Sequence, residues 1–184
     1  MKPAASGKRT RRLTASTSIE IDAPIDVVWA AMTDLRRYHE WNPFIVAIDD
    51  APADPAIGTR LRLHVRWQDG KTVRSWETLT RLDPPAAQEP APGGNAVPPG
   101  QRTAAMAYEF SSWLARAGFV VASREQTITQ QPGGPTVYRT EEAFNGLLGR
   151  FVPFANIEDG FRRHARALKQ RAEMLAEATG APVQ

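Results

Sequence analysis

The chain has 184 residues, of which 42% are hydrophobic and 23% charged, and it contains no cysteine. This length suits one domain with its own core, and the lack of cysteine excludes disulfides, thiolate catalysis and cysteine-based metal sites. The net charge of +3 comes from the first twelve residues, which hold five basic residues and no acid. The remainder is slightly acidic, which is not the charge pattern of a nucleic-acid-binding domain. No apolar run reaches the ~20 residues that span a bilayer, and the N-terminus lacks the apolar core of a secretory signal, so we expect a cytoplasmic protein without stable membrane insertion.

The residues after the basic tail predict one strand and two short helices. Alternation of apolar and polar residues over 17–22 has the two-residue period of a half-buried strand. A helix follows from Pro24, because proline is accepted in the first helical turn. Its apolar residues recur at three- and four-residue steps: Ile25, Val28, Trp29 and Met32. A second short helix over 35–41 ends at Asn42, because the residue before a proline avoids the α conformation.

Antiparallel strands follow over 45–48 and 59–67. The second alternates cleanly between an apolar face and a basic face, and Gly70 after it favours a hairpin turn because glycine tolerates a positive φ. The returning strand over 71–82 leaves two phases open. One phase turns Glu77 inward and Trp76 outward, and the other turns Trp76 inward. The alternation by itself does not choose between them.

Residues 83–102 are rich in Pro, Gly and Ala without periodicity, which predicts a flexible surface loop. A further strand after it places Met106, Tyr108 and Phe110 on one face. Residues 111–119 predict a bend or a single helical turn. Two more strands over 120–130 and 136–145 are joined by the Pro-Gly-Gly-Pro turn at 132–135.

A long helix is expected to finish the chain. Pro153 suits its start and Gly180 its end. Apolar residues form a stripe along it at helical spacing: Phe154, Ile157, Phe161, Ala165, Leu168, Ala172 and Leu175. Some 25 residues at 1.5 Å each give roughly 37 Å, which is enough to cross a whole sheet.

Three segments resemble the START-like (SRPBCC) superfamily. The run IEIDAPIDVVWAAMTDLRRYHEWNPFI (19–45) is similar to the opening of these proteins, where I-x-A-P-x-x-x-V-W precedes a short helix and a W-N-P-F turn. The run YRTEEAFNGLLGRFVP (138–153) is similar to their last strand and entry into the final helix, and GFRRHARALKQRAE (160–173) to that helix. The Pro-rich loop is longer than in the family pattern.

The resemblance implies an α+β helix-grip fold, in which a bent antiparallel sheet of six or seven strands wraps around a long C-terminal helix, with two short helices after the first strand. We expect a basic tail at 1–13, the START-like domain at 14–178 with its loop at 83–102, and a C-terminal tail at 179–184. The superfamily includes lipid-transfer domains, plant pollen-allergen relatives, polyketide cyclases and aromatases, and co-chaperone-like domains. One scaffold thus carries many activities, and function has to be argued from the site.

No motif for a metal, nucleotide or other cofactor is present, so none is expected: the three histidines are far apart, and no phosphate-binding loop follows a strand. His164 lies on the apolar stripe of the final helix. It is either a group that contacts a ligand or moves a proton, or a histidine at the edge of the core that a neighbour or water satisfies.

Glu142 shares a strand face with Tyr138, Thr140 and Phe144 by the two-residue period. If that face is buried, desolvation raises the pKa of Glu142 and makes it a candidate acid or base. The alternative is that Glu142 reaches water at the end of the sheet or pairs with an arginine such as Arg124.

Aromatic residues gather on the faces expected to turn inward, and with Glu142 and His164 they form the predicted ligand-binding set. Its members are Trp41, Phe44, Trp67, Tyr108, Phe110, Tyr138, Glu142, Phe144, Phe161 and His164. A packed core would use the same aromatics, but the resemblance implies an apolar cavity with few polar groups.

Three functions are therefore compared. The first is binding or transport of a small hydrophobic molecule, such as a lipid, an isoprenoid or a polyketide-like aromatic, without catalysis. The second is a cyclase or dehydratase that uses Glu142 and His164 as acid and base. The third is a protein-interaction module with a filled core. The sequence predicts neither the ligand nor the oligomeric state.

Overall fold

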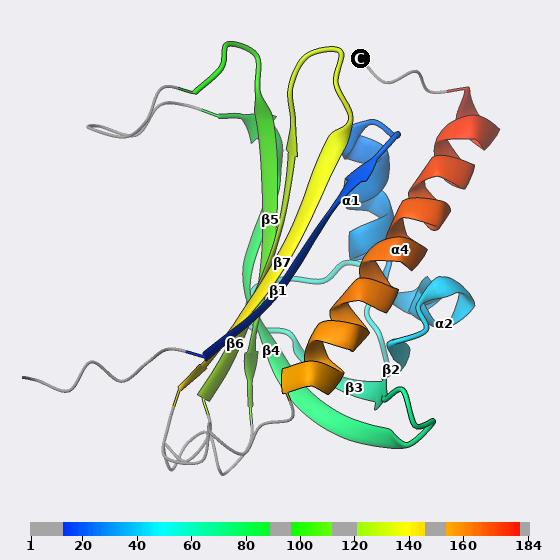
Figure 1. Ribbon diagram of the computed structural model, residues 1–184, viewed down its shortest axis with the longest axis vertical. Coiled ribbons are helices and arrows are strands. Elements are labelled where there is room, and N and C mark those ends of the chain that lie inside the picture. Colours follow the sequence, from blue (N-terminus) through cyan, green and yellow to red (C-terminus); the bar gives the residue numbers. More distant parts are fainter. Residues whose placement is uncertain (1–12, 89–96, 112–120, 146–153, 181–184) are drawn as a thin grey trace, which may run out of the picture.

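A computed structural model describes residues 13–88, 97–111, 121–145 and 154–180 of the chain. The described residues form a seven-stranded antiparallel sheet with helices on one face (Figure 1). The strands are β1 (Leu13–Ile21), β2 (Ile45–Asp49), β3 (Arg60–Arg66), β4 (Thr72–Ala87), β5 (Arg102–Phe110), β6 (Val121–Gln130) and β7 (Thr136–Asn145). The helices are α1 (Ile25–Thr33), the 3₁₀ turn η1 (Leu35–Arg37), α2 (Tyr38–Trp41) and α4 (Phe154–Thr179).

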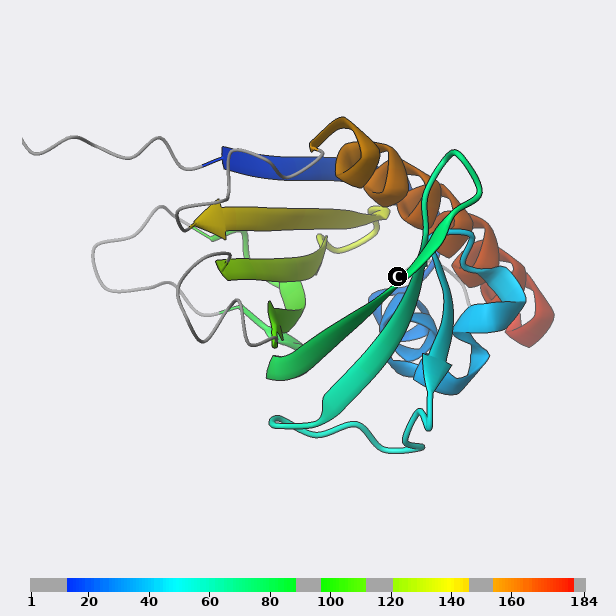
Figure 2. The same ribbon diagram turned by 90° about the horizontal axis from the view of Figure 1, so that it is seen from below.

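The strands lie in the order β1-β7-β6-β5-β4-β3-β2, and every neighbouring pair is antiparallel. β1 therefore pairs with the last strand of the chain, with Ile21 opposite Thr136. The sheet curls, so that β4, β3 and β2 turn away from β1, β7 and β6 (Figure 2). This is the helix-grip fold that the resemblance implies, and it confirms the predicted fold class.

The core lies between the concave face of the sheet and α4. The predicted apolar stripe of α4 is buried at Ile157, Phe161 and Leu168, because residues three and four apart share one helix face. Helices α1 and α2 contact the same helix and close the interior on that side. None of the described helices combines the length and apolar character needed to span a bilayer.

The pairing of β3 with β4 decides the strand phase that the sequence leaves open. Leu61 of β3 lies opposite Glu77, and Leu61 is buried, so Glu77 faces inward with it. Trp76 faces outward, where the guanidinium carbons of Arg60 and Arg62 lie 4.9 and 5.5 Å from its ring centre. Stacking on two cationic side chains stabilises this aromatic residue in water.

Strands β4 and β5 extend into the segment that the sequence predicts as a loop. β4 continues through Pro84 and Pro85 to Ala87, and β5 begins at Arg102, so residues 83–87 are strand rather than loop. The pairing shifts register between Asp83 and Ala86. Prolines fit there because a bulge does not need their missing N–H group. The predicted bend over 111–119 lies, apart from its first residue, outside the described residues.

Candidate functional site

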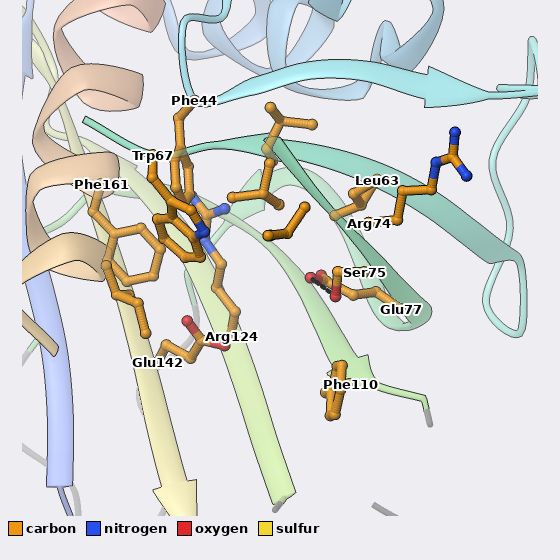
Figure 3. A pocket seen from close by; sticks show the side chains of 14 residues that line it. Phe44, Leu63, Trp67, Arg74, Ser75, Glu77, Phe110, Arg124, Glu142 and Phe161 are labelled. Carbon is orange, nitrogen blue, oxygen red and sulfur yellow. Dashed lines mark hydrogen bonds between the residues drawn. The ribbon is translucent and has the colours of Figure 1, made fainter. Parts of the chain in front are cut away.

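A cavity of about 240 Å³ lies between the curled sheet and the first turns of α4 (Figure 3). Its wall is mainly apolar, with side chains from strands β2 to β7 and from α4. Its polar side chains are Arg74, Ser75, Glu77, Arg124 and Glu142. An apolar space with a few polar groups is the usual composition of a small-molecule site.

Three aromatic side chains form one end of this cavity. The ring centre of Phe44 lies 5.9 Å from that of Trp67 and 6.0 Å from that of Phe161. Phe44 comes from the turn before β2, Trp67 directly follows β3, and Phe161 belongs to α4. Tilted and edge-on contacts of this kind are favourable beyond the area they bury, so the aromatic wall is held in place by its own packing.

Asn42 stabilises the turn that places Phe44 at the cavity. Its Oδ1 accepts hydrogen bonds from the backbone N–H groups of Phe44 and Ile45, both at 3.0 Å. Its Nδ2 therefore donates to Nδ1 of His164, at 2.8 Å. One buried side chain thus satisfies two backbone donors and ties the turn to α4.

The same contact defines the state of His164. Because Nδ1 accepts from Asn42, the proton of the neutral ring is on Nε2. The ring is fully buried against Tyr38, Trp41 and Tyr138, and Nε2 has no hydrogen-bond partner among the described residues. Burial, followed by the charge of Arg124, lowers the pKa of His164 well below its ordinary value. His164 is a neutral residue of the core behind the cavity and is not among the residues that line it.

Arg124 brings a positive charge to the cavity wall. Its side chain is buried, and Nε donates to Oγ1 of Thr140 at 3.0 Å. Nη2 makes two longer contacts, to Gln126 Oε1 at 3.4 Å and to Tyr138 Oη at 3.5 Å. The guanidinium carbon lies 4.4 Å from the ring centre of Phe161. A charge buried this far is stabilised by neutral oxygens and an aromatic face.

Two carboxyl groups share the cavity with Arg124. Glu142 lies directly across from it in the pairing of β6 with β7, and Glu77 comes from β4. Burial raises the pKa of Glu142 to about 8, with a further increase from Glu77 and an opposing effect from Arg124. Burial also raises the pKa of Glu77, against the effects of Arg124 and of a hydrogen bond from Ser75. At neutral pH the cavity therefore holds a fixed cation beside a carboxyl group that is largely protonated.

The structure brings half of the predicted site residues to the cavity. Phe44, Trp67, Phe110, Glu142 and Phe161 line it. The other five do not: they are Trp41, Tyr108, Tyr138, Phe144 and His164. That any of the ten binds a ligand stays a prediction.

The five residues outside the lining pack behind it or beside it. Trp41 lies against His164, and Phe144 lies edge-on to Phe154. The hydroxyl groups of the two tyrosines are satisfied internally, since Tyr138 donates to Gln126 and Tyr108 donates to Met106. The two-residue period correctly predicts the inward face of the strand residues Tyr108, Tyr138 and Phe144. It does not distinguish a packed side chain from one that borders a cavity.

Arg124 and Glu77 are the functional candidates that the sequence did not place. Arg124 shares its strand phase with Ile128, which is fully buried, so the alternation along 120–130 contains the signal for an inward arginine. Glu77 had no such signal, because the phase of its strand depends on β3. Among the residues that the structure describes, no three His, Asp or Glu side chains group in a way that could hold a metal ion.

Comparisons with known proteins agree with the fold. Residues 12–89 match the family described as "Polyketide cyclase / dehydrase and lipid transport". No curated protein matches the sequence.

Solved structures that are similar to the chain include the ZhuI aromatase/cyclase from Streptomyces sp. R1128. Its TM-score is 0.62 at 15% identity, over 94% of this chain and 100% of that one. Major latex-like protein 151 from Panax ginseng gives 0.60 at 11% identity, over 88% and 97%. The di-domain aromatase/cyclase BexL of the BE-7585A biosynthetic pathway gives 0.52 at 17% identity, over 90% of this chain but 50% of BexL, so the chain spans half of that protein. At these identities the likeness shows the fold alone.

Proposed function

We propose that this chain, a START-like (SRPBCC) protein, binds a small and mainly apolar molecule in the cavity between its sheet and α4. The superfamily assignment is supported by the family match over residues 12–89 and by the helix-grip fold. The observation that carries the proposal is the cavity itself, whose aromatic side chains provide apolar contact area and whose few polar side chains include Arg124, Glu77 and Glu142. A volume of about 240 Å³ is below the ~300–1,000 Å³ of most drug-sized sites, which favours a compact ligand.

A second candidate is an enzyme of the cyclase or dehydratase type. A carboxyl group whose pKa is about 8 can give or take a proton near neutral pH, and Glu142 is such a group beside a cation in an apolar cavity. His164 is a weaker candidate for its partner, because its ring lies behind the cavity wall and Nδ1 is already occupied by Asn42. In an enzyme Glu142→Gln removes turnover and keeps binding, whereas in a carrier there is no turnover to remove.

A protein-interaction module is the third candidate, and it requires a filled core. The cavity does not fit that requirement.

Native mass spectrometry of the purified protein, followed by organic extraction, tests the binding function. We expect an adduct of one defined mass. The variant Ser75→Phe places a ring in the cavity from β4 and should lose the adduct.

Thr72→Phe is the matched control, because Thr72 is an exposed residue of the same strand that lies outside the cavity lining. It should keep the adduct. A wild-type protein that carries no adduct and takes none up from a panel of lipids and aromatic compounds would refute the proposed function and favour the interaction module.

A further inference from the structure

We infer that the ligand of this cavity carries an anionic oxygen, as a carboxylate or an ionised phenol or enol, and that this oxygen pairs with the guanidinium of Arg124. The inference rests on the proposed binding function and adds the chemical class of the ligand. Its basis is the set of partners that Arg124 has in the structure.

Every hydrogen-bond acceptor that the described residues provide for Arg124 is neutral. The three acceptors are the Thr140 hydroxyl, the Gln126 amide and the Tyr138 hydroxyl, and the last two lie at 3.4 and 3.5 Å from Nη2. None of the ion pairs between described residues includes Arg124. A buried cation without a counterion is costly, and a charged partner reduces that cost. The part of the chain that the structure describes thus holds a positive charge in an apolar wall and forms no ion pair with it.

The geometry leaves room at the guanidinium for such a partner. Arg124 has five N–H donors in a planar fork, and Nη1 donates none of the hydrogen bonds that the described residues make. Arg124 is itself one of the residues that line the cavity. Figure 3 shows the side chain rising past Glu142 toward Trp67, with its nitrogens inside the ring of lining residues. A carboxylate accepts two hydrogen bonds from this fork side by side.

The neighbouring carboxyl groups do not occupy that position. Glu142 is opposite Arg124 in the sheet, and Glu77 approaches from β4, but neither is its partner in the ion pairs between described residues. Burial favours the protonated form of both. A protonated carboxyl group donates a hydrogen bond, so Glu142 is suited to a second contact with an anionic oxygen.

The aromatic end of the cavity determines the rest of the ligand. Phe44, Trp67 and Phe161 surround the side of the space that Arg124 reaches. A compact acid with a flat or short apolar body places its anion at Arg124 and its carbon skeleton against these rings.

Paired probes that differ only in charge test the inference by isothermal titration calorimetry. The acids are naphthoate and octanoate, and their neutral counterparts are naphthamide and octanamide. At about pH 6.5 a simple carboxylic acid is ionised. A charge-assisted hydrogen bond is roughly twice as strong as a neutral one, so at least one acid should bind about ten-fold more tightly than its amide.

Variants then identify the group that recognises the charge. Arg124→Gln should bring the acid and the amide to equal affinity. Arg124→Lys keeps a positive charge and should keep part of the preference, and it also serves if the glutamine variant does not fold. Arg139→Gln is the matched control, because Arg139 is an exposed residue of β7 that pairs with Glu141 outside the cavity, and it should keep the full preference.

The outcomes separate this inference from the proposed function. Equal binding of acid and amide to the wild-type protein overturns the inference and leaves the binding function in place. A preference that survives in Arg124→Gln also overturns it, because another group then holds the anion. If none of the four probes binds and no adduct is found by native mass spectrometry, the proposed function itself fails.

Discussion

At the scale of single residues, the environment of Glu142 is unusual for a carboxyl group. It faces Arg124 across the sheet, yet the two do not form an ion pair, and burial dominates its ionisation. The raised pKa of about 8 means that the folded protein holds a proton that the unfolded chain releases near pH 4.5. Between these values folding takes up a proton, so the free energy of unfolding falls as the pH rises.

Glu142→Gln should remove this dependence. Below about pH 4.5 both states of the wild-type protein are protonated, and the substitution changes little. From there to about pH 8 the wild-type protein loses stability relative to the variant. We expect a loss on the order of 2 kcal/mol, less than the full pKa shift would give, because Glu142 is only partly buried and solvent screens part of the effect. Urea unfolding of both proteins at several pH values measures the difference.

Glu141→Gln is the control for this experiment, since Glu141 is the adjacent residue and pairs with Arg139. A difference between Glu142→Gln and wild type that stays constant from pH 5 to pH 8 would contradict the raised pKa. His164 contributes to acid sensitivity in both proteins equally, and its effect cancels in the comparison.

At the scale of elements, the approach of α4 to the turn before β2 depends on a glycine. Gly160 lies in the interior of α4, where glycine costs ~1 kcal/mol relative to alanine. A Cβ at this position would collide with the ring of Phe44. The missing side chain therefore lets the helix approach the aromatic residue that forms one end of the cavity.

Gly160→Ala should destabilise the protein in spite of the better helix propensity of alanine. Overpacking typically costs about 1–3 kcal/mol. Because the Cβ would meet a rigid aromatic ring, we expect a cost in the upper part of this range, above the ~1 kcal/mol that alanine gains from its helix propensity. Thermal and urea unfolding measure the net loss. In a Phe44→Leu background the same substitution should cost less, because the smaller side chain leaves space for the Cβ. Equal costs in the two backgrounds would show that Phe44 is not the obstacle.

At the scale of the whole molecule, one curled sheet and one long helix enclose both the core and the cavity. The cavity wall draws on six of the seven strands and on α4, so residues far apart in the chain meet only in the folded protein. A ligand bound there is lost on unfolding, and binding therefore stabilises the fold as a whole.

Saturating naphthoate should raise the melting temperature of the wild-type protein. At a free concentration of about 100 times Kd the stabilisation is ~2.7 kcal/mol, which corresponds to about 5–10 °C for a chain of this size. Differential scanning calorimetry measures the shift. The blocked variant Ser75→Phe should show none, whereas Thr72→Phe should respond as the wild type does. An equal shift in the blocked variant would place the binding site elsewhere.

Local sequence patterns predict the order of the elements and most of the inward faces. Local periodicity carries this information, because the stripe on α4 and the alternation in β3 and β7 follow from residue spacing alone. The fold class is predicted from the resemblance of the W-N-P-F turn and of the last strand and helix to the START-like superfamily. The turn residues Gly70 and Gly133 adopt the positive φ that their turns require.

Which inward residues border a cavity and which pack behind it depends on contacts between elements, and the sequence patterns do not contain this information. His164 and Tyr138 each share an inward face with lining residues. His164, however, packs against Tyr38 and Trp41 of α2, which is distant in sequence, and the Tyr138 hydroxyl donates to Gln126 of β6. The phase of β4 followed from its pairing with β3, and the strand character of residues 83–87 from pairing with β5 across a bulge. Residue spacing indicates which side of an element is apolar. The ionisation of Glu142 and the shape of the cavity depend instead on side chains from several elements that meet only in the folded protein.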